Sequence, residues 1–246
     1  MRLLKAGLFV VSSIFSFAGP LLAKERQYVF ILQENAPLFS DRSLHQKERQ
    51  AHLFEKFEIT SNLGNPVELR RGRKKYWVDR SHINLPPASW TRRSEAGIDL
   101  WLPSADRFTF SIDGTDEDCH INAEIGCRTM HYTGQKFIVE INEHDKRLVK
   151  KLKRPLDYYR DSTMDVNLQI NGLQVRFVEM TGLLDGGAGS SVGFFDPVRN
   201  YYLSIVVWCN GPLCQPSEEQ EFRLQARRIL LSSVWFMQYK GRAAYK

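Results

Sequence analysis

Residues that could act as nucleophiles, proton carriers or metal ligands are scattered along this chain. A serine nucleophile needs a partnered histidine and a carboxylate, yet the Gly-x-Ser-x-Gly motif is absent. The His-Glu-x-x-His pattern of zinc hydrolases is absent as well. The six histidines are His45, His52, His82, His120, His131 and His144. We therefore predict no catalytic residue, no metal and no cofactor, and more generally a protein that is not an enzyme. A site assembled from distant residues stays open, as in an envelope hydrolase without a known motif.

The four cysteines fall into two local pairs. Cys119 and Cys127 are eight positions apart, and Cys209 and Cys214 are five apart. In an oxidising compartment each pair would close a short loop, with a stabilisation of about 2–3 kcal/mol. Zinc is the alternative, but only Cys209 and Cys214 approach the spacing of a zinc site, with two histidines near the other pair. We predict two local disulfides.

The N-terminus has the pattern of a secretory signal peptide. In Met1–Ala23, Arg2 and Lys5 precede the apolar run Ala6–Ala18, and a small residue stands at the expected cleavage point. The alternative, a membrane anchor, requires a longer apolar run. We expect a periplasmic or secreted protein with no transmembrane anchor after cleavage. Removal of the two basic residues leaves a net charge of +4 from the original +6, which argues against a nucleic-acid partner.

Residues 28–85 carry short strand patterns interrupted by turns. Val67–Arg70 and Lys75–Val78 flank Gly72 and predict a tight hairpin. Asp41–Lys56 is charged and predicts a short helix or a long loop. The basic run from Arg70 to Lys75, which includes Arg71 and Arg73, indicates either a solvated turn or a surface for an acidic partner.

The segment 28–85 resembles a bacterial SH3-like domain. The resemblance rests on a closing strand with Tyr76, Trp77 and Val78, followed by a short turn and Ile83. It implies a small β-barrel that binds cell-wall peptide or protein, with Phe39, Tyr76 and Trp77 as candidate binding residues. The alternative is that Trp77 belongs to the core of the barrel.

Proline-rich residues 86–97 predict a linker, and residues 98–238 predict a second domain. Val166–Ile170 and Leu173–Met180 flank an Asn-Gly turn and predict a hairpin. Tyr201–Cys209 has the composition of a buried strand.

A capping pattern at Ser217 to Gln220 predicts a helix. Its apolar side would carry Phe222, Ala226, Ile229, Leu230 and Ser233. Glu143–Leu152 predicts another helix, and the glycine-rich Leu183–Gly193 predicts a mobile loop.

The order of strands before a terminal helix resembles the PsbP-like α+β fold. The residues that carry this likeness are Ser232, Ser233, Trp235 and Phe236. The resemblance implies a binding scaffold and adds no catalytic residue.

Together the patterns predict an α+β protein, with a small SH3-like β-barrel followed by an antiparallel-sheet domain and a packed C-terminal helix. The predicted function is that of an exported, non-catalytic binding protein that recognises another protein, such as a toxin-neutralising immunity-type protein. Its binding loop would be Leu183–Gly193 or the Arg70–Lys75 turn. The alternative partner is peptidoglycan.

Overall fold

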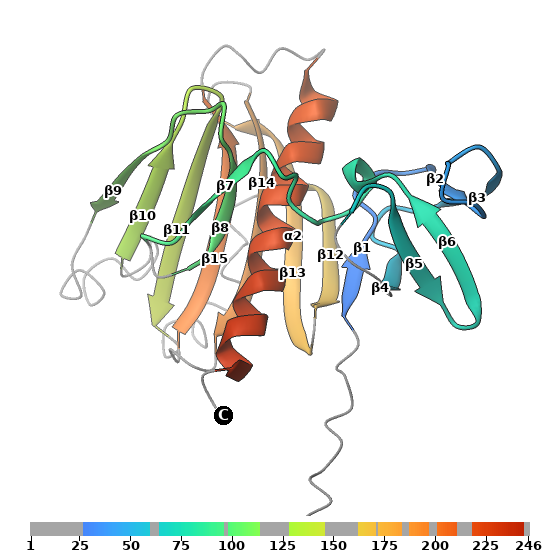
Figure 1. Ribbon diagram of the computed structural model, residues 1–246. Helices are drawn as coiled ribbons and strands as arrows, with labels where there is room; N and C mark the ends of the chain where they lie inside the picture. Colours follow the sequence, from blue (N-terminus) through green and yellow to red (C-terminus); the bar gives the residue numbers. More distant parts are fainter. Residues whose placement is uncertain are drawn as a thin grey trace, which may run out of the picture.

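The computed structural model describes residues 27–59, 64–95, 98–113, 128–145, 162–170, 172–183, 187–196, 201–210 and 218–243. Within these ranges the chain forms two large antiparallel sheets, one two-stranded sheet and one α-helix (Figure 1). The protein is therefore mainly β, and the predicted α+β class is wrong. The predicted leader and three of the four cysteines lie outside the described residues.

The N-terminal strands form a six-stranded sheet in the order β1-β4-β5-β6-β2-β3. This sheet is open, because the described strands β1 and β3 stand at its two edges and do not pair with each other. The predicted closed barrel is therefore wrong. The strands are β1 (Tyr28–Phe30), β2 (Ala36–Phe39), β3 (Lys47–Ala51), β4 (Lys56–Ile59), β5 (Val67–Arg71) and β6 (Lys74–Val78).

Edge strand β3 lies where the sequence predicted a helix or a loop. Its first four residues, Lys47 to Gln50, are polar, and only Ala51 is fully buried. An edge strand with charged side chains on both faces shows no alternation of apolar and polar residues, so the sequence pattern conceals it. Such charges also protect an unpaired edge from association with other strands.

The hairpin of β5 and β6 is confirmed. Arg71 pairs with Lys74, so Gly72 and Arg73 form a two-residue turn. Gly72 has φ +63°, as the first central residue of a type II′ turn requires. The 3₁₀ turn η1 (Arg80–His82) follows β6, with the Asp79 side chain accepting a hydrogen bond from the Ser81 backbone N–H at its start.

The C-terminal strands form a seven-stranded sheet in the order β12-β13-β14-β15-β11-β10-β9. The hairpin of β12 and β13 is confirmed, with Ile170 opposite Leu173. Glu143 to Asp145, predicted as the start of a helix, belong to β11. The strands are β9 (Thr109–Asp113), β10 (Arg128–Thr133), β11 (Phe137–Asp145), β12 (Ser162–Ile170), β13 (Leu173–Leu183), β14 (Gly187–Asp196) and β15 (Tyr201–Cys209).

Strand β14 is the largest departure from the sequence prediction. Residues 187–193 were expected in a mobile loop, but they form a strand that pairs with β13 on one side and β15 on the other. Its serines Ser190 and Ser191 are fully buried. Ser190 shares a face with Ala188 and Val192, which belong to the core cluster that includes α2. Its small side chain leaves room for the helix, which packs against β14.

Helix α2 (Glu219–Ala243) covers one face of the seven-stranded sheet. The five residues predicted for its apolar side are all buried. On the same helix, Arg227 donates to both carboxylate oxygens of buried Glu179 at 2.7 and 2.9 Å. Strands β7 (Trp90–Arg93) and β8 (Leu100–Pro103) pair with each other, and β8 also packs against α2. Part of the predicted linker is thus a strand.

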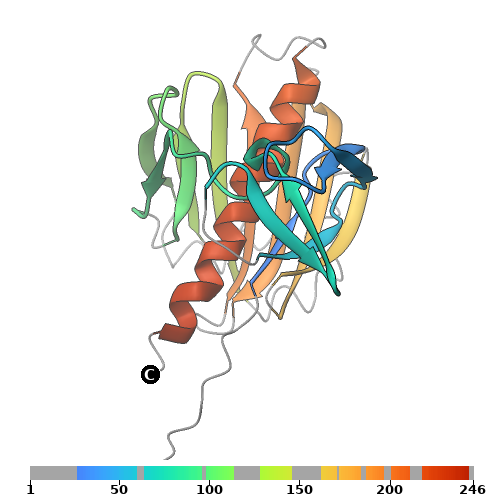
Figure 2. The ribbon, with the colours of Figure 1, turned by 45° about the vertical axis from the view of Figure 1, so that its right-hand side comes forward.

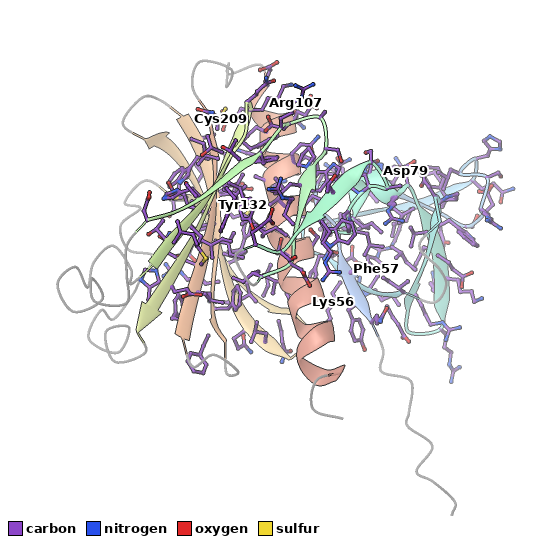
Figure 3. All side chains as sticks on the ribbon, turned by 60° about the vertical axis from the view of Figure 1, so that its left-hand side comes forward. Lys56, Phe57, Asp79, Arg107, Tyr132 and Cys209 are labelled. Carbon is purple, nitrogen blue, oxygen red and sulfur yellow. The ribbon has the colours of Figure 1, made fainter. Side chains whose placement is uncertain are left out.

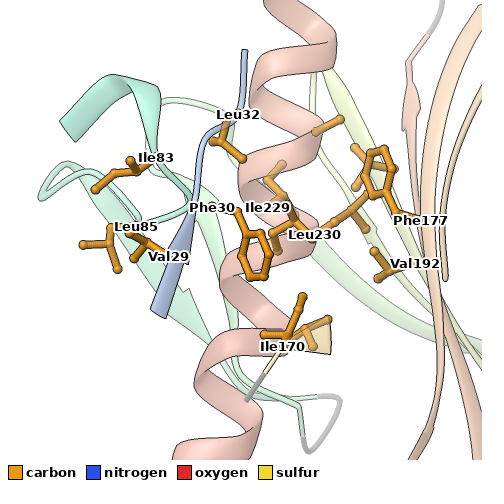
Figure 4. Packing of buried hydrophobic residues seen from close by; sticks show 14 of the residues in the cluster. Val29, Phe30, Leu32, Ile83, Leu85, Ile170, Phe177, Val192, Ile229 and Leu230 are labelled. Carbon is orange, nitrogen blue, oxygen red and sulfur yellow. The ribbon is translucent and has the colours of Figure 1, made fainter. Parts of the chain in front are cut away.

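The larger of two hydrophobic clusters among the described residues joins the two large sheets through α2 (Figure 4). Phe30 of β1 lies beside Leu230 of the helix, and the rings of Phe54 and Phe177 meet edge to face at 5.0 Å. Buried Asn84 accepts from the Phe30 backbone N–H at 2.8 Å and donates to the Leu231 carbonyl at 3.4 Å. The six-stranded sheet therefore shares its interior with the C-terminal helix.

Candidate functional site

The tip of the β5–β6 hairpin is rich in basic residues. Figure 1 shows this hairpin on the side of the molecule opposite β9, and in Figure 2 it lies in front of α2. Its five basic residues are all exposed: Arg70, Arg71, Arg73, Lys74 and Lys75. Three of them are paired, since Lys74 lies 3.4 Å from Glu48, Lys75 lies 3.1 Å from Glu68, and Arg71 contacts Glu55.

Arg70 and Arg73 form no salt bridge with any described residue, and both are open to solvent. Their charge is therefore available to a partner. The sequence analysis selected Arg71 and Arg73. Arg73 lies in the turn, and Arg71 is paired with the carboxylate of Glu55.

Glu55 organises the side of this hairpin. It receives a hydrogen bond from Arg49 at 2.5 Å and contacts Arg71. Burial alone would raise the pKa of Glu55, but hydrogen bonds from Arg49 and from the His52 backbone N–H hold that pKa below its usual value. Glu55 thus stays ionised and fixes two guanidinium groups, one of them on the hairpin.

The three predicted aromatic residues separate onto two faces of the sheet. Tyr76 is buried, and its ring meets Phe57 edge to face at 6.0 Å. Phe39 and Trp77 are direct partners across β2 and β6, and both are half-buried. Successive residues of a strand point to opposite faces, which explains why Tyr76 cannot share a surface with Trp77.

The same alternation places Arg70 and Lys75 on the face of Trp77, because Arg70 pairs with Lys75 across β5 and β6. The Arg42 guanidinium lies 5.7 Å from the centre of the Trp77 ring. Arg42 escaped the sequence analysis, since no pattern links a turn residue to a strand thirty-five positions away. We call Phe39, Arg42, Arg70, Lys75 and Trp77 the outer face.

A histidine and a serine meet on the seven-stranded sheet. His144 Nε2 lies 3.1 Å from Ser204 Oγ, and both residues are buried. Burial lowers the pKa of His144 to about 4. The imidazole is therefore neutral at pH 7 and a weak base, and the described residues supply no carboxylate to orient it. The pair is a structural hydrogen bond rather than a nucleophile with its base.

A second histidine, His131, lies 3.1 Å from Asp113 and 3.8 Å from Glu140. Across the residues that the structure describes, no group of three or more histidine, cysteine, aspartate or glutamate side chains is arranged to hold a metal ion. Within the same residues, no helix combines the length and apolar character needed to cross a membrane.

A cavity of about 320 Å³ lies between the β7–β8 hairpin and the start of α2. Phe137 and Phe222 stack at 5.7 Å in its wall. The buried Asp106 carboxylate in this wall accepts from the backbone N–H groups of Lys136 and Phe137 at 3.1 Å each, so its charge serves the β10–β11 turn. Cys209 also lines the cavity and is not a free thiol.

A second cavity, of about 360 Å³, lies between η1 and α2. Arg80 and Arg228 both line it.

Comparisons with known proteins leave the function open. No family model matches the chain, and no curated protein matches it. One solved structure with some similarity is a Pseudomonas aeruginosa protein of unknown function, described as a candidate regulator. It is 13% identical in sequence, covers 58% of this chain and 96% of its own, and has a TM-score of 0.29. A score this low supports no conclusion about fold or activity.

Proposed function

We propose that this chain is an exported, non-catalytic protein that binds another protein through the basic β5–β6 hairpin and its outer face. The observation that carries the proposal is the exposed tip, where Arg70 and Arg73 have no salt-bridge partner among the described residues. Charged groups of this kind steer an oppositely charged partner and set its orientation. The proposed partner surface is therefore acidic.

Two further features support this choice. Half-buried Trp77, with Arg42 over its ring, supplies an aromatic anchor beside the charge, and tryptophan and arginine dominate the energetics of protein interfaces. Of the two loops predicted to contact a partner, residues 187–193 form an internal strand, which leaves the Arg70–Lys75 turn. A toxin-neutralising role fits the proposal, because an acidic rim around a toxin's active site would be complementary.

The test uses the mature chain, Lys24–Lys246, as bait in a periplasmic extract at low and high salt. We expect one stoichiometric protein partner, retained at low salt and weakened at high salt, because exposed charges are screened. The variant carrying Arg70→Glu and Arg73→Glu should lose this partner. The control Arg107→Glu makes one such charge reversal, half the charge change of the double variant, at an exposed position before β9, away from the six-stranded sheet (Figure 3), and should retain it.

Equal capture by the double variant and by the original chain would show that the hairpin is not the interface. Sedimentation with purified sacculi tests the alternative partner, peptidoglycan. Release from sacculi by Trp77→Ala, with no protein partner in the extract, would replace the proposal with peptidoglycan binding.

A further inference from the structure

The cavity between η1 and α2 contains a buried cation with an incomplete hydrogen-bond shell. Arg228 lines this cavity and is 5% exposed. Its side chain donates to the Ser81 carbonyl, but its Nε has no hydrogen-bond partner among the described residues. It also forms no salt bridge with any of them. The guanidinium lies 5.8 Å from the centre of the Trp90 ring, but no described carboxylate is within salt-bridge distance, and a buried guanidinium that is incompletely paired is costly.

A second guanidinium reinforces the positive charge of the cavity. Arg80 lines the same space and donates to the Pro86 carbonyl from Nε at 3.1 Å and from a terminal nitrogen at 2.6 Å. Asp79 is the one described carboxylate in the lining, and it is already engaged by the Ser81 backbone N–H at 2.8 Å and by Asn65 at 3.2 Å.

The cavity is large enough to admit a small anion, and its charged lining residues are two arginines and one aspartate. Its other lining residues are small or polar, namely Gly64, Asn65, Ser81, Pro87 and Ala88. Several of them are exposed, so the space opens to solvent. The planar fork of a guanidinium matches the geometry of a carboxylate or phosphate group.

We propose that the cavity between η1 and α2 binds a small oxyanion, a carboxylate or a phosphate group, through Arg228 with Arg80 beside it. The site is independent of the proposed protein interface. The length of β6 separates Asp79 from the hairpin tip, about 16 Å at 3.3 Å per strand residue. Because Arg80 belongs to the six-stranded side and Arg228 to α2, a bound anion would connect the two halves of the molecule.

The experiment measures thermal unfolding of the mature chain with sodium phosphate, with sodium acetate, and with sodium chloride at matched ionic strength. We expect phosphate or acetate to raise the melting temperature with saturation, because a ligand that binds only the folded state stabilises it. The anion that raises the melting temperature at the lower concentration identifies the ligand class, phosphate or carboxylate. Calorimetric titration with that anion then gives the dissociation constant.

Arg228→Met is the decisive variant. It removes a buried, incompletely paired charge, so we expect the anion-free protein to be at least as stable as the original, with the anion response lost. Arg228→Lys should weaken binding by about tenfold or more, because it keeps the charge without the fork. The control is Arg227→Met, one position earlier on α2, which breaks the contact with Glu179 and should lower stability while leaving the anion response intact.

Two results would overturn the proposal. One is a melting temperature of the original chain that responds no more to phosphate and acetate than to chloride. The other is an equal anion response in Arg228→Met and the original chain. Loss of folding in Arg228→Met would move the test to Arg228→Lys and Arg80→Gln, either of which must weaken anion binding.

Discussion

Buried charge at single residues sets the sharpest expectations for this protein. Glu179 is 2% exposed and engages Arg227 and, at 3.4 Å, Arg223. Glu179→Ala would leave Arg227 without its carboxylate and Arg223 with Glu219 alone, and we expect a loss of about 3–5 kcal/mol of unfolding free energy in denaturant titrations. Asp165→Ala is the matched control, because the pair of Asp165 with Arg176 is partly exposed and should cost less than about 1 kcal/mol. Equal losses would contradict this account.

His144 should make the fold sensitive to mild acid. Its pKa is about 4 in the folded protein because of burial, against 6.5 for the exposed side chain. Below pH 6.5 the unfolded chain therefore binds a proton that the folded chain does not, and stability falls as the pH drops from 6.5 towards 4. The full effect is about 3 kcal/mol.

The check on this prediction is the unfolding free energy of His144→Gln from pH 7.5 to pH 5. We expect a shallower dependence on pH than in the original chain. Burial also lowers the pKa of His82, so a residual slope of the same sign should remain. Identical slopes in the two proteins would exclude His144 as the source.

At the scale of elements, strand β14 tests how α2 packs on the sheet. Ser190 is fully buried and its hydroxyl has no hydrogen-bond partner in the described part of the chain. Ser190→Ala should therefore be neutral or stabilising by up to about 1 kcal/mol. Ser190→Leu should cost about 1–3 kcal/mol, because the strand lies directly beneath the helix. The measurement is the melting temperature of the two variants. A Ser190→Leu protein as stable as Ser190→Ala, or more stable, would show that β14 is loosely packed.

The elements also show where sequence reasoning succeeds and fails. The β12–β13 hairpin and the buried stripe of α2 were predictable, because turn chemistry and apolar periodicity are local properties. Strand β14 was missed because its small residues are explained by close packing against helix α2. This helix lies more than twenty positions later in the chain, so no local pattern reveals the packing. Edge strand β3 was missed because exposure on both faces removes the alternation.

The same limit applies to the candidate site. The basic run was visible in the sequence, and so was the hairpin that carries it. Alternation along the strand could have shown that Tyr76 and Trp77 lie on opposite faces of the sheet. The approach of Arg42 to Trp77, and of Arg80 to Arg228, depends on tertiary packing and leaves no local signal.

At the scale of the whole molecule, the shared core predicts one cooperative unfolding transition. Asn84 bonds both to β1 and to α2, so Asn84→Ala should lower stability by about 1–3 kcal/mol by stranding a buried backbone group. Hydrogen exchange followed by mass spectrometry should show β4 to β6 and α2 losing protection together. Exchange of the six-stranded sheet at conditions that leave α2 protected would show two independent domains.

The contact between β1 and α2 has a consequence for how the chain is made. Arg227 donates to the Leu32 carbonyl at 2.8 Å across 195 positions of sequence. A chain that leaves a ribosome or an export channel N-terminus first exposes Phe30 and Leu32 until helix α2 has also emerged. Contacts of such long sequence separation form late and slowly, and the waiting strands are prone to aggregation. We expect the nascent chain to need a holding chaperone until its final turn is complete.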